Sequence, residues 1–153
     1  MKQRLDVKIL FVLCCFGFSA FNVPPAAAFS GLKVNVEIVK ADKSGKVDPE
    51  LKALAKEVSP LLNFTGFSLL KETSTSLKIE EKAEIVLSPG RVLELQFLGF
   101  EDDKARLLAR ILEKDKETFR TVLLLVDKGN VLIGGPPHED GVLLLRVGGE
   151  FKD

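Results

Sequence analysis

The segment RVLELQFLGFEDDKARLLARILEKDKETFRTVLLLVDKGNVLI (residues 91–133) decides the fold class of this chain. Its residues 91–97 and 118–126 alternate apolar and polar side chains, which is the period-two pattern of a strand with a buried face. The sequence DKGN (residues 127–130) predicts a hairpin turn, with Gly129 at a positive φ. Short connections join antiparallel neighbours, so this segment predicts a β-meander.

Residues 105–112, ARLLARIL, suit either an α-helix or a strand. Charged turns precede and follow this stretch at a spacing that is typical of strands, and a predicted strand comes directly after it. We therefore interpret residues 105–112 as a strand of the meander.

Before this segment, residues 32–40 alternate β-branched and polar side chains and predict a first strand. A helix is predicted for residues 48–59, where Asp48 can cap the first turn and Pro49 suits the first helical position. Its apolar side chains fall on one face at helical spacing: Leu51, Leu54, Ala55 and Val58. Pro60 disfavours helical geometry in the residue before it, so we expect the helix to end there.

The remaining strands complete an antiparallel set. Residues 67–79 predict one long bent strand or two short ones, and residues 83–87, 131–133 and 142–147 predict three more. The last of these is apolar on both faces apart from Arg146, so we expect it to be buried within a sheet. The predicted fold is α+β and mostly β: one N-terminal strand and one helix packed on a meander of six to eight strands. The meander would form a sandwich or a partly open barrel.

Residues 1–28 have the pattern of a secretory signal peptide. A basic start precedes the uncharged apolar run at residues 9–23, and the small residues Ala26 to Ala28 satisfy signal peptidase. Two prolines stop the run short of the roughly 20 apolar residues that a membrane-spanning helix needs. We therefore expect cleavage after Ala28 and a single periplasmic or secreted domain of residues 29–153, without a transmembrane span.

Cleavage changes which functions the composition allows. Both cysteines, Cys14 and Cys15, lie in the middle of the apolar run, where they do not suit lipid attachment, and they leave with the signal peptide. The remaining 125 residues hold 19 basic and 21 acidic residues and no cysteine, so disulfides and thiolate metal sites are excluded. The net charge of −2 gives no support to nucleic-acid binding. The chain also lacks Tyr and Trp, which sugar-binding faces and interface hot spots favour.

The most distinctive motif is GGPPHEDG (residues 134–141), which contains the only histidine of the chain. One interpretation is a binding loop made of Gly134, Gly135, Pro136, Pro137, His138, Glu139 and Asp140. Another is a tight exposed turn, stiffened by prolines and solvated by charges. A metal site at His138 would need further ligands, and no second His or Cys is present after cleavage. We therefore predict neither a catalytic site nor a metal site nor a cofactor.

Four parts of the chain resemble uncharacterised exported proteins of Gram-negative bacteria. They are VNVEIVKA (residues 34–41), the helix after Asp48-Pro49, FTGFSLL (residues 64–70) and VLIGGPPHEDGVLLLRV (residues 131–147). The resemblance implies a periplasmic location and carries no activity.

Three functions follow as hypotheses. The first is a non-enzymatic periplasmic domain that acts through protein contacts, with another envelope protein as its partner. The second is a carrier that holds a small apolar ligand between sheet and helix. The third is a hydrolase that uses His138.

Overall fold

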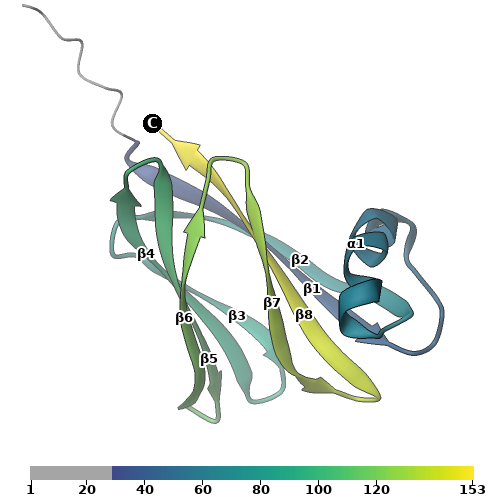
Figure 1. Cartoon of the computed structure of the whole chain (residues 1–153). Helices are drawn as coiled ribbons and strands as arrows, with labels where there is room; N and C mark the ends of the chain where they lie inside the picture. Colours follow the sequence, from purple (N-terminus) through teal and green to yellow (C-terminus); the bar gives the residue numbers. More distant parts are fainter. Residues whose placement is uncertain (1–28) are drawn as a thin grey trace, which may run out of the picture.

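The computed structural model describes residues 29–153, which form eight strands and one α-helix (Figure 1). The signal peptide predicted for residues 1–28 lies outside the described residues. The strands are β1 (Gly31–Asp42), β2 (Gly66–Lys78), β3 (Lys82–Ser88), β4 (Arg91–Glu101), β5 (Lys104–Glu113), β6 (Lys116–Leu125), β7 (Asn130–His138) and β8 (Gly141–Lys152). The helix, α1 (Lys52–Leu62), follows a short 3-10 turn (Pro49–Leu51) between β1 and β2.

The strands make two four-stranded antiparallel sheets, in the orders β2-β1-β8-β7 and β3-β4-β5-β6. Seven strands follow the helix, so the α+β, mostly-β prediction is confirmed. No strand ladder joins β2 to β3 or β6 to β7 in the described part of the chain, so the sheets do not close into a barrel. The last strand, β8, lies between β1 and β7, which confirms that residues 142–147 are central in a sheet.

The main core lies between the two sheets. Leu93, Leu95 and Phe97 of β4 are fully buried there, on the face that the alternation predicted. Alternate residues of β1 and β8 belong to the same core, among them Val36 and Leu145. Two facing apolar surfaces of this kind stabilise a sandwich because each covers the other from water.

A second, smaller core lies under α1, on the outer face of the first sheet. Val39 and Ala41 of β1 are buried here against the helix residues Leu54 and Val58. Up to Ile38 the buried side chains of β1 face the other sheet, and from Val39 on they face α1, because the helix covers the outer face of the sheet there. β1 keeps its register with β8 through this point, and the bulge against β1 lies on β2. One strand therefore contributes to both cores.

Two predictions about the helix are wrong. It continues through Pro60 to Leu62 and ends where Asn63 adopts a left-handed φ of 53°. Pro60 has no backbone N–H, so the helix loses one hydrogen bond at this residue. The helix tolerates that loss because it ends within the next turn, at Leu62. Asp48 makes no side-chain cap, and its carboxylate instead accepts a hydrogen bond of 2.8 Å from the backbone N–H of Leu69 on β2.

The turn after β6 also differs from the prediction. Lys128, with a φ of 59°, holds the left-handed position that the sequence assigned to Gly129. The turn does not join hydrogen-bonded neighbours but carries the chain from one sheet to the other. Its backbone pairs with β8, through hydrogen bonds between Lys128 and Gly149 (2.8 Å) and between Gly149 and Gly129 (3.0 Å).

Among the described residues, no helix combines the length and apolar character that crossing a membrane requires.

Candidate functional site

The motif GGPPHEDG does not form one loop. Residues 134–138 belong to β7, and only Glu139 and Asp140 lie in the turn before β8. The sequence interpretation of an exposed loop over the whole motif is therefore wrong. β7 is an edge strand, where Pro136 and Pro137 are tolerated because the N–H groups they lack are not needed for pairing. Prolines and the bulge between Gly134 and Pro137 protect this edge from pairing with another chain.

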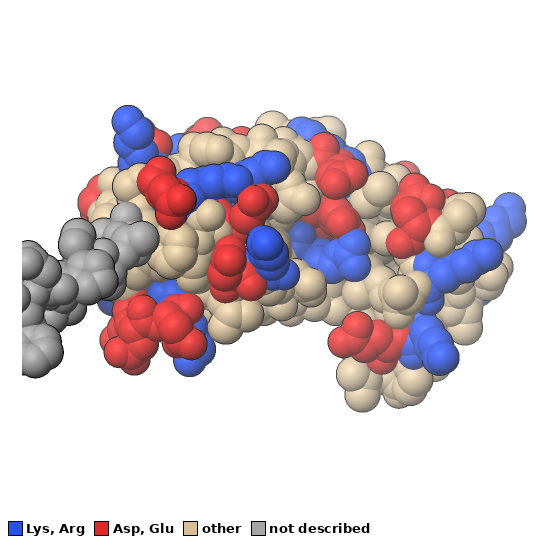
Figure 2. Space-filling model, turned by 90° about the horizontal axis from the view of Figure 1, so that it is seen from above, with Lys and Arg blue, Asp and Glu red and all other residues tan. Residues whose placement is uncertain are grey.

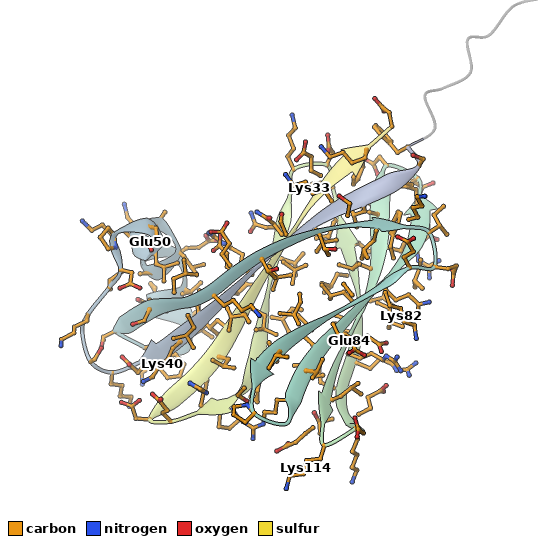
Figure 3. The ribbon with its side chains drawn as sticks, turned by 180° about the vertical axis from the view of Figure 1, so that it is seen from behind. Lys33, Lys40, Glu50, Lys82, Glu84 and Lys114 are labelled. Carbon is orange, nitrogen blue, oxygen red and sulfur yellow. The ribbon has the colours of Figure 1, made fainter. Side chains whose placement is uncertain are left out.

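Lys40 of β1 holds the turn of this motif. Its ammonium lies 2.6 Å from Glu139 Oε2 and 2.8 Å from Asp140 Oδ1, and Asp42 Oδ2 is 3.8 Å away. Hydrogen bonds to Asp140 and Glu139 raise the pKa of Lys40 well above its usual range. The same contacts lower the pKa of both carboxyls. In Figure 3, Lys40 lies at the helix end of β1, away from Lys33.

Close backbone packing explains two glycines of the motif. A Cβ on Gly141 would overlap the carbonyl oxygen of Ala41 on β1, and a Cβ on Gly135 would lie 2.8 Å from the carbonyl oxygen of Leu143. Arg91 of the second sheet donates a hydrogen bond of 2.7 Å to the carbonyl of Pro137. The motif therefore stabilises the fold through close packing, a hydrogen bond and ion pairs. Its role in binding stays a prediction.

His138 has one acidic neighbour. Its side chain is half-buried, and Nε2 lies 3.9 Å from Glu139 Oε1. In the part of the chain that the structure describes, no group of three or more His, Cys, Asp or Glu side chains is arranged to hold a metal ion.

A pocket of about 590 Å³ lies at the other end of the sandwich, and we call it the aromatic end pocket. Its lining residues are Phe29, Phe100, Asp102, Asp103, Val126, Asp127 and Phe151. They come from the start of the described chain, from the end of β4 and the β4–β5 turn, from the β6–β7 turn and from the end of β8. Figure 1 shows these segments together at one end of the sandwich, away from α1. The volume of the aromatic end pocket falls within the usual range of ligand-binding sites.

Phenylalanine rings form the apolar wall of this pocket. The ring of Phe100 lies 4.8 Å from that of Phe151 and 5.7 Å from that of Phe29, and the edge-on ring of Phe97 lies 5.1 Å behind it. These spacings are those of stabilising edge-to-face aromatic pairs. Phe29 is 41% exposed and Val126 is 47% exposed, so the pocket presents apolar surface to solvent.

Three aspartates surround the apolar wall. Asp102 and Asp103 form the tip of the β4–β5 turn, where Asp102 adopts a left-handed φ of 53°. Asp127 accepts a hydrogen bond of 2.9 Å from the backbone N–H of Phe151 and so fixes the end of β8. Figure 2 shows acidic side chains gathered beside the grey residues, which mark where the described chain begins. The pocket is therefore apolar inside and acidic at its rim.

Sequence reasoning missed this site. From the sequence, neither the phenylalanines nor the acidic turn at residues 101–103 was predicted to be part of a site. Phe29 and Phe151 lie at opposite ends of the described chain, and they meet because β1 pairs with β8, with Leu32 opposite Phe151. The sequence held one local signal of this site, which is that Phe100 directly precedes the acidic turn.

Searches of protein-family models, curated proteins and solved structures found no match to this chain. The resemblance to exported Gram-negative proteins therefore stays a prediction. The carrier hypothesis also stays a prediction, although the buried residues between helix and sheet are at most 7% exposed and fill that space with side chains.

Proposed function

We propose that this chain is a non-enzymatic domain of the cell envelope that binds another protein through the aromatic end pocket. One observation carries the proposal: an apolar pocket built of exposed phenylalanine and valine side chains is surrounded by three carboxylates. Exposed apolar surface with a polar rim is typical of protein-binding sites.

The pocket chemistry defines the partner segment. An apolar side chain of the partner would pack against the exposed faces of Phe29, Phe100 and Phe151, and burial of one such side chain contributes about 1.5–3 kcal/mol. A neighbouring Lys or Arg would face Asp102 and Asp103. Charges at an exposed rim add more to specificity and association rate than to affinity. The expected ligand is thus a segment in which an apolar residue lies next to a basic one.

The predicted export supports an envelope partner. Cleavage after Ala28 would leave Phe29 as the first residue of the mature chain, so every residue that lines the pocket would be retained. The proposed site is therefore complete in the exported form.

A peptide-selection experiment tests this function. A random library of displayed peptides is selected on the purified protein and, in parallel, on a variant with Asp102→Asn and Asp103→Asn. Asparagine tolerates the left-handed φ of residue 102, so the turn should keep its shape. We expect the protein to enrich peptides that combine Leu or Phe with Lys or Arg, and we expect the variant to lose the basic preference.

Asp115→Asn provides the matched control. Asp115 is also an exposed turn aspartate with a left-handed φ, of 66°, but it lies in the β5–β6 turn, outside the aromatic end pocket. The control should select the same peptides as the unchanged protein. Enrichment of peptides without basic residues, or an equal loss in both variants, would contradict the proposed function.

A further inference from the structure

A second hollow, the polar groove, lies on the outer face of the first sheet. It has a volume of about 360 Å³ and is lined by β1, β8, the β6–β7 turn and the first residue of β7. The side chains on which its chemistry depends are Lys33, Asn35, Lys128, Asn130 and Arg146. None of these residues lines the aromatic end pocket, so the groove is a separate site.

The floor of the polar groove is one row of the sheet. Gly148 of β8 is paired with Asn35 of β1 on one side and with Asn130 of β7 on the other. Because glycine has no side chain, a gap remains between the two amides. On β2, Ser74 Oγ donates a hydrogen bond to Asn35 Oδ1, which leaves the NH₂ group of Asn35 as a donor.

Some charged side chains of the groove have an oppositely charged partner and others do not. Arg146 is paired with Glu37, and Glu150 has Lys152 at 2.7 Å and Lys33 at 4.0 Å. No carboxylate lies within 4 Å of Lys128 Nζ among the residues that the structure describes. Three cations face two carboxylates along the lining, so the groove has a net positive charge. Lys128 interacts with Glu150 at longer range than 4 Å, and it is the lining cation without a close carboxylate among the described residues.

We propose that the polar groove binds the carboxyl terminus of an extended peptide. The terminal carboxylate pairs with Lys128, and the preceding peptide units lie over Gly148 between the two asparagines. A peptide unit has one N–H donor and one carbonyl acceptor, and a side-chain amide offers the complementary pair. The apolar content of the ligand is unimportant here, because polar side chains and glycines line the groove.

The probe is acetyl-Ala-Ala-Ala with a free carboxylate, titrated into ¹⁵N-labelled protein and followed by NMR. Its matched control is the same peptide with a carboxamide end, which keeps the peptide units and removes the charge. We expect shifts at the amides of Asn35, Gly148 and Gly149, and about fivefold weaker binding of the carboxamide, the value of a good surface ion pair. Equal affinity for both peptides, or shifts confined to other surfaces, would overturn the proposal.

Gly148→Val tests the location of the site. A Cβ at residue 148 would meet its nearest neighbours at 3.5–3.8 Å, which is ordinary contact, so the fold should tolerate the valine while its side chain fills the gap. Gly134→Val, on the same sheet, is the control because no atom lies within 4 Å of its Cβ. Loss of binding in Gly148→Val alone supports the proposal. Unchanged binding by Gly148→Val with native-like NMR spectra contradicts it.

Lys128→Asn tests the assigned cation, since asparagine accepts the left-handed φ of this position. The variant should bind the carboxylate and carboxamide peptides with equal, weak affinity. A retained preference for the carboxylate would show that Lys128 is not the cation that binds it.

Discussion

The ammonium of Lys40 lies 2.8 Å from Oδ1 of Asp140, which ties the middle strand β1 of the first sheet to the β7–β8 turn. Only 16% of the Lys40 side chain is exposed, whereas Glu139 and Asp140 are largely exposed. The two ion pairs therefore attach a solvent-exposed turn to a lysine side chain that is mostly buried.

Lys40→Met should lower the stability of the domain in a pH-dependent way. The pKa values of Glu139 and Asp140 are lowered in the folded state, so their contribution is present above about pH 4 and disappears as the pH falls through the folded values. The pKa of Lys40 is raised in the folded state, so its contribution is complete below its unfolded value, about pH 10, and is lost gradually as the pH rises from there through the raised folded value. Urea midpoints from pH 2.5 to 11 should therefore differ most between about pH 4 and pH 10, and the difference should shrink strongly toward pH 2.5 and only in part toward pH 11.

Lys104→Met is the control for this ion pair. Lys104 Nζ lies 3.9 Å from Asp103 Oδ1, with both side chains well exposed, and such pairs contribute little. An urea midpoint that falls as far in Lys104→Met as in Lys40→Met would show that the turn is not stabilised by Lys40.

Gly141→Ala should destabilise the fold because its Cβ would overlap a backbone oxygen of β1, and the two central strands would have to separate. Overpacking of this kind costs about 1–3 kcal/mol. Gly134→Ala, whose Cβ meets no atom within 4 Å, should change the free energy of unfolding by less than about 1 kcal/mol. Urea denaturation of both variants measures the difference, and equal stabilities would refute the packing argument.

Local patterns predicted most of the strands and the buried face of β4 correctly, but they ended β7 too early, at residue 133. Residues 105–112 form most of β5 rather than a helix, and Leu93, Leu95 and Phe97 are buried together. These outcomes follow from period-two alternation, which a residue's near neighbours determine. The same patterns cannot show where one sheet ends and the next begins, because that depends on which distant strands pair.

The wrong predictions arise because contacts with residues far away in the sequence override the local pattern. The sequence around Pro136 and Pro137 has the composition of a loop, but the neighbouring strand β8 keeps it in an edge strand. Asp48 has the position of a helix cap, but its carboxylate accepts a hydrogen bond from the N–H of Leu69, which lies 21 residues later. The aromatic end pocket combines residues from both ends of the described chain, so only the pairing of β1 with β8 could reveal it.

Asp48→Ala should therefore weaken β2 and leave the helix start unchanged. Loss of a hydrogen bond to a charged acceptor costs about 1–3 kcal/mol. We expect faster amide hydrogen exchange at Leu69, with unchanged exchange in the first turn of α1. Asp48→Asn keeps an acceptor oxygen and should restore most of the protection. Faster exchange limited to the helix start would support the capping role instead.

Phe29→Ala should destabilise the domain although the residue lies at the start of the described chain. Its ring lies 5.2 Å from that of Phe151 and 5.7 Å from that of Phe100, and 41% of the residue remains exposed. Since somewhat more than half of a phenylalanine is buried, the expected loss is about 1–2 kcal/mol.

Leu61→Ala is the comparison for Phe29→Ala, because Leu61 is 79% exposed on α1 and its truncation should cost less than about 0.5 kcal/mol. Thermal unfolding of both variants measures the contrast. If Phe29→Ala is as stable as Leu61→Ala, the first residue of the predicted mature chain does not help to build the aromatic end pocket. The pocket wall would then rest on Phe100 and Phe151 alone, and a partner would meet a wider, shallower surface.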